Sequence, residues 1–173
     1  MRALRTVLAA CLAFATLPAW SSPAELEIKG LRIGMSEGQF KKLYPKAACA
    51  PSAREAGWDA TIPRRRTCSI QGFTLANRET QSTAFYFYEG KLGSWDARFS
   101  PLSVRYLRSA LEEKFGAPEG GFRAAPAKWR FDAVAMTLHS ASPIIVLEVT
   151  SPVHDAWQEK LRAFERKPKK ADL

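Results

Sequence analysis

The chain has 173 residues, of which 46% are hydrophobic and 25% are charged, and its formal net charge is +9. This length suits one domain. Ten Phe and five Trp residues are enough for a packed core, which excludes a chain that is disordered over most of its length. The positive charge is concentrated in residues 64–66 and 167–170, a pattern typical of proteins with acidic partners.

The N-terminal segment has the pattern of a cleaved signal peptide. Arg2 and Arg5 precede an almost wholly apolar run from Thr6 to Leu17, and small residues follow. We expect cleavage after Ala24, which removes residues 1–24 and leaves a periplasmic or secreted chain with a net charge of about +7.

Two other interpretations of this segment stay open. An uncleaved membrane anchor would need about 20 apolar residues, more than this run provides, so we expect no transmembrane span in the mature form. Leu8–Cys11 looks like a lipobox, which would make Cys11 a lipidation site. Because the apolar run continues past Cys11, we favour cleavage without lipidation.

Two cysteines remain in the mature chain. An even pair in an exported protein predicts a disulfide between Cys49 and Cys68. Closing a loop of this size stabilises a protein by about 3 kcal/mol in the chain-entropy model. The enclosed segment is rich in Pro, Ala, Arg and Gly and has weak periodicity, so a structural link accounts for the pair. The alternative is a redox site, but the C-x-x-C spacing of such sites is absent from the sequence.

The mature sequence begins with a helix and continues with strands. Ser36 is a good N-cap, Gln39 completes a capping box, and Pro45 ends the helix. After the cysteine loop, apolar alternation and a glycine turn predict three strands, at residues 67–73, 82–88 and 92–99.

The same order then occurs a second time. Ser100 and Pro101 begin a helix whose apolar stripe reaches Phe115, and Gly116 ends it. Three strands follow at about residues 127–131, 134–140 and 143–150. A second Ser-Pro pair begins a C-terminal amphipathic helix, on one side of which lie Val153, Trp157, Leu161 and Phe164.

This order predicts one α+β domain over residues 25–165, followed by a basic tail at residues 166–173. Two repeat-like halves, at about residues 31–99 and 100–151, each combine a short helix with an antiparallel β-meander. We expect the helices to pack on one face of the sheet, because each has one apolar side to bury, and the domain to end in the C-terminal amphipathic helix.

The two halves carry a resemblance to known proteins. A short helix introduced by Gly34-Met35-Ser36 is followed by a meander that contains Phe-Tyr-Phe-Tyr-Glu-Gly-Lys-Leu at residues 85–92. This combination resembles the BamE/SmpA-like periplasmic proteins. The doubled helix-plus-meander unit is similar to the two-repeat architecture of the β-lactamase-inhibitor proteins. The resemblance implies a non-enzymatic module that binds another protein.

The sequence offers no recognisable catalytic or metal-binding constellation. Neither His139 nor His154 is at ligand spacing from another His or Cys. No Gly-x-Ser-x-Gly motif is present, and the adjacent carboxylates Glu112 and Glu113 diverge on a helix. We therefore predict no catalytic residue, no metal and no cofactor. A hydrolase whose site combines residues distant in sequence stays open as an alternative.

Alternation in the strand at residues 82–88 indicates a candidate binding surface. If Phe85 and Phe87 face the helices, Tyr86 and Tyr88 face outward, and the polar tip of tyrosine suits a wet surface. We predict that this open sheet face contacts a partner, with help from three consecutive arginines: Arg64, Arg65 and Arg66. The alternative is that the aromatic residues belong to the core.

These expectations favour a non-catalytic periplasmic protein-binding module, such as an inhibitor, immunity or envelope-assembly accessory protein. Its partner would be an envelope or exported protein. A second hypothesis is a basic envelope-surface binder of lipopolysaccharide or anionic lipid. We do not expect nucleic acid as a partner, because the acidic partners that an exported chain meets are of other kinds.

Overall fold

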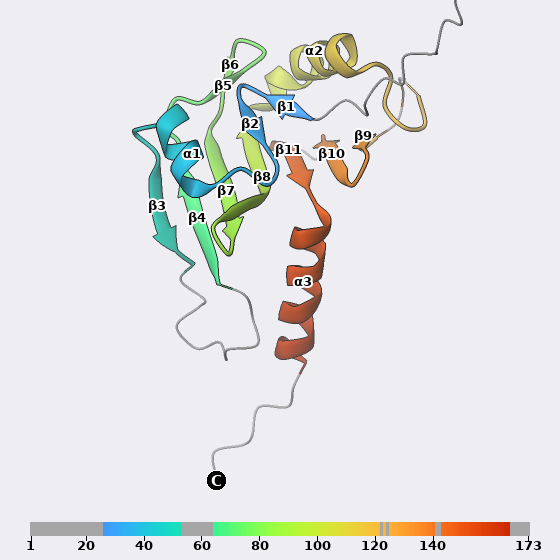
Figure 1. Ribbon diagram of the computed structural model, residues 1–173. Coiled ribbons are helices and arrows are strands. Elements are labelled where there is room, and N and C mark those ends of the chain that lie inside the picture. Colours follow the sequence, from blue (N-terminus) through green and yellow to red (C-terminus); the bar gives the residue numbers. More distant parts are fainter. Residues whose placement is uncertain (1–25, 53–63, 122, 124, 141–142, 167–173) are drawn as a thin grey trace, which may run out of the picture.

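A computed structural model describes residues 26–52, 64–121, 123, 125–140 and 143–166 (Figure 1). The predicted signal peptide, most of the loop between the cysteines, and the basic tail from Lys167 onward lie outside the described residues. Among the described residues, no helix is long and apolar enough to cross a membrane.

The centre of the fold is a seven-stranded antiparallel sheet. Its spatial order is β3 (Ala48–Pro51), β4 (Arg65–Ser69), β7 (Ser82–Tyr88), β8 (Lys91–Phe99), β11 (Ile145–Thr150), β10 (Val134–His139) and β9 (Ala127–Phe131). Each half of the chain enters at one edge and proceeds inward, so that β8 and β11 meet in the middle. The predicted α+β class with an antiparallel sheet is confirmed.

Strand β4 begins and ends earlier than predicted. It pairs with β7 from Arg65 onward and with β3 on its other side, so it starts before Thr67. The chain turns before Phe73, where Gly72 has a φ of 68°, a conformation that glycine adopts without steric cost.

Two short hairpins were not predicted. They are formed by β1 (Glu27–Ile28) with β2 (Leu31–Arg32) and by β5 (Thr74–Leu75) with β6 (Arg78–Glu79). A strand of two residues is too short to show alternation in the sequence. The turn of each hairpin contains residues with positive φ, which are Lys29, Gly30, Ala76 and Asn77.

Helix α1 (Glu37–Leu43) begins as predicted. The backbone N–H of Gln39 donates to the Ser36 side chain, and the Gln39 side chain accepts from the Ser36 N–H, so the capping box is complete. Phe40 is fully buried, with its ring centroid 4.9 Å from that of Phe85 and 5.3 Å from that of Phe87. These contacts join α1 to β7.

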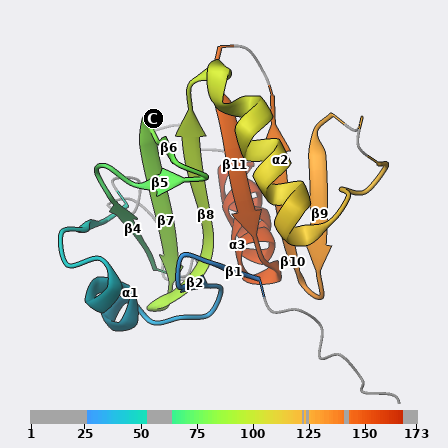
Figure 2. The same ribbon diagram turned by 90° about the horizontal axis from the view of Figure 1, so that it is seen from above.

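Helix α2 (Val104–Phe115) covers the other half of the same sheet face. A 3-10 turn at Pro101–Ser103 precedes it, and Gly116 ends it with a φ of 79°, as the predicted stop requires. Leu107 and Leu111 are buried in the same core as the side chains of β7, β8 and β11 that point toward this face. Figure 2 shows α1 and α2 in front of the sheet.

Helix α3 (Pro152–Glu165) lies on the opposite face of the sheet, behind it in Figure 2. Trp157 and Leu161 form a second buried cluster with Tyr88. The predicted C-terminal helix is therefore confirmed, but it does not join the face that α1 and α2 cover. Val153 is 55% exposed rather than buried, because in the first turn His154 makes the contact with the sheet.

Candidate functional site

The three arginines of the predicted binding surface do not share one face of the sheet. Arg65 and Arg66 are neighbours on β4, so their side chains point to opposite faces. The Nε atom of Arg66 lies 3.0 Å from a carboxylate oxygen of Glu37 on α1. The guanidinium of Arg65 lies 4.3 Å from the ring centroid of Trp157 on α3. Arg64 is exposed just before the strand.

Helix α3 covers the sheet face at Tyr88, one of the two tyrosines of the predicted binding surface. Tyr88 is 3% exposed, because Trp157 packs against it with ring centroids 5.4 Å apart and its hydroxyl lies 2.7 Å from His154 Nδ1. Tyr86 is partly buried, and its hydroxyl donates to Asp96 Oδ2 at 2.9 Å. The prediction of an uncovered face is therefore wrong at Tyr88, because α3 packs on it.

His154 is the polar anchor of α3 on the sheet. Its Nδ1 atom lies 2.8 Å from Ser94 Oγ and within hydrogen-bond distance of the Tyr88 hydroxyl. Burial lowers the pKa of His154, although the charges of Glu148 and Asp155 oppose this shift. In a neutral ring with its proton on Nε2, Nδ1 can accept a hydrogen bond from one of these two hydroxyls. Ser94 is 2% exposed, so this Ser–His contact joins α3 to the sheet and offers no accessible nucleophile.

Beyond α3, many of the described side chains on the same face of β8, β11, β10 and β9 are partly or fully exposed. The strand registers place ten partly buried or exposed side chains there, which we call the open face: Asp96, Arg98, Lys128, Arg130, Ala135, Thr137, His139, Val146, Glu148 and Thr150. Their neighbours along the central strands, such as Ala97 and Leu147, point to the α1–α2 side and are fully buried. An antiparallel sheet can leave one face solvated, so a partner can reach this surface.

Two carboxylates lie at the centre of the open face. Asp96 on β8 is directly opposite Glu148 on β11, and like charges in this position destabilise a sheet. Burial, together with the charge of Glu148, raises the pKa of Asp96 against the hydrogen bond from Tyr86 and the charge of Arg98. Arg98 Nε is 3.8 Å from Asp96, and His139 Nε2 is 3.4 Å from Glu148, so each carboxylate has one nearby basic group.

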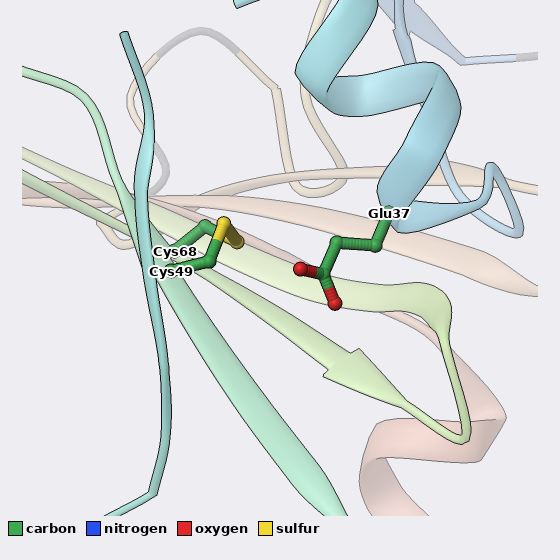
Figure 3. A group of neighbouring side chains, drawn as sticks. All are labelled: Glu37, Cys49 and Cys68. Carbon is green, nitrogen blue, oxygen red and sulfur yellow. A yellow bond between two sulfur atoms is a disulfide. The ribbon is translucent and has the colours of Figure 1, made fainter. Parts of the chain in front are cut away.

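A separate polar group joins α1 to the edge of the sheet. The Glu37 carboxylate and the sulfurs of Cys49 and Cys68 lie within 4.8 Å of one another (Figure 3). The two sulfurs form the predicted disulfide, which is confirmed and links β3 to β4. A metal would need thiolates, which a disulfide does not supply. Glu37 also pairs with Lys41 at 2.8 Å, so this group is a structural link.

Comparison with known proteins adds no relative. The chain matches no protein-family model, and neither the curated proteins nor the solved structures contain a match. The resemblance to the BamE/SmpA-like and β-lactamase-inhibitor proteins therefore stays a prediction. The geometry of the open face is the main evidence that bears on function.

Proposed function

We propose that this protein is a non-catalytic, exported protein-binding module whose partner docks on the open face. The observation that carries the proposal is the pair of carboxylates, Asp96 and Glu148, opposite each other on a partly exposed sheet. Their repulsion costs stability in the isolated chain. A cation from a partner would offset that cost, and a local cost of this kind is typical of functional sites.

The charges around the pair define the chemistry of the partner. Arg98 is exposed beside the acidic centre, and Arg130 is exposed on β9, where it pairs with Glu119 at 3.0 Å. A complementary protein would therefore present a Lys or Arg side chain to the centre and acidic side chains around it. Arginine suits the centre best, because its planar guanidinium can donate to both carboxylates at once.

Two further observations support a binding role in an oxidising compartment. The Cys49–Cys68 disulfide is typical of exported proteins and agrees with the expected signal peptide. Among the described residues, the closest approach to a catalytic arrangement is the contact of Ser94 with His154, and α3 covers it. The open face combines charged and partly buried side chains, as is usual for the rim of a protein interface.

The proposal is tested by removing the charges of Asp96 and Glu148 with substitutions that keep the size and shape of each side chain. In the variant Asp96→Asn with Glu148→Gln, we expect no loss of thermal stability, because burial and the charge of Glu148 both oppose the ionised form of Asp96. Capture of the partner by in-cell crosslinking of the tagged protein should fall by about tenfold or more. Mass spectrometry of the captured material gives the measurement.

Glu113→Gln is the matched control, because it removes an exposed carboxylate from α2 on the other side of the sheet. The control should capture the partner as the unaltered protein does. Equal capture of one protein by the double variant would overturn the proposal. Capture of lipid-rich material alone, released by salt, would favour an envelope-surface binder instead.

A further inference from the structure

A small apolar pocket lies on the α2 side of the sheet, between α2 and the two short hairpins. Its volume is about 150 Å³. The inner walls are formed by side chains that are at most 8% exposed, which are Ile28, Leu75, Leu107 and Leu111. Three partly exposed residues complete the apolar lining, which are Ala76, Ala110 and Phe115. The pocket is thus distinct from the open face, which is on the other side of the sheet.

Two lysines also line the pocket. Lys29 Nζ donates to Thr74 Oγ1 at 2.9 Å, and Lys114 Nζ donates to the backbone oxygen of Glu27 at 2.9 Å. Both lysines are exposed. The Lys29 Nζ atom lies 5.7 Å from the ring centroid of Phe73, and the Lys114 Nζ atom lies 5.2 Å from that of Phe115. An ammonium has three donors, and each of these hydrogen bonds uses one. Among the described residues that line the pocket, none carries a carboxylate.

We propose that this pocket binds a small apolar carboxylic acid in its ionised form. A cavity of about 150 Å³ lined by Leu, Ile and Phe can hold a group of the size of benzene, so a phenyl ring or a short alkyl chain fits the interior. The carboxylate would accept charge-assisted hydrogen bonds from Lys114 and Lys29, the two cationic residues of the lining. A mostly apolar pocket with a few polar groups at one end is the usual form of a small-molecule site.

The proposal does not depend on the protein-binding role, because the two sites are on opposite sides of the sheet. A ligand here would lie against β1, β5 and α2, the segments that close the core on this side. The expected consequence is a ligand-dependent rise in the unfolding temperature, since a ligand that binds only the folded state stabilises it.

Calorimetric titration of the disulfide-bonded mature chain with four probes tests the ligand chemistry. The probes are 3-phenylpropanoate, 3-phenylpropanol, 3-phenylpropylamine and acetate. We expect 3-phenylpropanoate to bind about tenfold more tightly than the alcohol, and the amine and acetate to give no measurable binding. Equal affinity for the acid and the alcohol, or no binding of the acid at millimolar concentration, would overturn the proposal.

Two substitutions locate the site. Ala110→Leu fills the pocket, so it should lower the affinity for 3-phenylpropanoate by about tenfold or more. Ser109→Leu adds the same side chain at the neighbouring exposed position and should leave the affinity unchanged. Lys114→Gln should weaken binding of the acid several-fold and leave binding of the alcohol unchanged. Retained affinity in Ala110→Leu would place the ligand elsewhere and contradict the assignment.

Discussion

Alternate side chains along each strand point to the two faces of the central sheet, and these two faces are stabilised in different ways. On the α1–α2 side, side chains from the central strands join one large core that includes Phe85, Trp95 and Leu147. On the α3 side, Tyr88, Trp157 and Leu161 form a smaller buried cluster with Tyr86 and Phe164 packed against it, and many of the other described side chains on that face are partly exposed. Alternation along a strand therefore shows which side chains share a face, whereas the position of the helices decides which face becomes core.

The largest expected effect comes from Phe85→Ala on the α1–α2 side. Phe85 is fully buried and packs against Phe40 and Trp95, so its loss leaves a cavity and should lower the free energy of unfolding by about 4 kcal/mol. Tyr86→Ala changes the next residue, on the other face of the sheet. It should lower the free energy of unfolding clearly less, because Tyr86 is only partly buried. Urea unfolding measures both, and equal losses would show that the two faces are equally core.

Two identical leucine truncations sharpen the comparison between the helices. Leu107→Ala in α2 removes a fully buried side chain of the large core, whereas Leu161→Ala in α3 removes one that is 8% exposed in a small cluster. We expect the free energy of unfolding to fall by about 4 kcal/mol in Leu107→Ala and by about 2 kcal/mol in Leu161→Ala. Thermal unfolding followed by circular dichroism would detect the difference, and the reverse order would contradict the comparison.

Strand β11 allows the same test within six residues. Val149 is fully buried on the α1–α2 side, and Val146 is partly exposed on the open face. Val149→Thr buries a hydroxyl in apolar surroundings and should lower the free energy of unfolding by about 2 kcal/mol. Val146→Thr keeps its hydroxyl near water and should change the free energy of unfolding by less than about 0.5 kcal/mol. A comparable cost at both positions would mean that the open face is covered.

The smallest effect should come from protonation of His154. Burial places its folded-state pKa below the ordinary value of 6.5, so the neutral ring stabilises the fold fully above pH 6.5. As the pH falls from 6.5 toward the lower folded-state pKa, the unfolded state binds more protons and stability is lost. Urea unfolding between pH 7.5 and pH 5 measures this loss, which should be reduced in His154→Gln. An unchanged pH dependence in that variant would assign the effect to another group.

Several local features could be predicted because they depend on residues close together in the chain. The capping box of Ser36 and Gln39 and the stop at Gly116 follow from hydrogen bonds and backbone preferences within one turn of helix. The pairing of Cys49 with Cys68 follows from their number in an exported chain. The hairpins of two-residue strands could not be predicted, since they are too short for a periodic signal.

The open face shows the limit of the same reasoning. Alternation in residues 91–99 places Asp96 and Arg98 on one side of their strand, and alternation in residues 145–150 does the same for Glu148. No local pattern pairs these two strands, which are about 50 residues apart in the sequence. The alternation in each strand was therefore visible in the sequence, but the pairing of the two strands, which forms the site, was not.

The α+β class, the caps of the helices and the disulfide could be predicted from the sequence alone, because they depend on periodicity, capping residues and residue type over short distances. Only the tertiary structure decided that β8 lies beside β11, that α3 packs on Tyr88, and that Asp96 meets Glu148. These contacts join distant segments, and their energies come from burial and from charges brought together in space. Such terms depend on the whole fold rather than on any one segment.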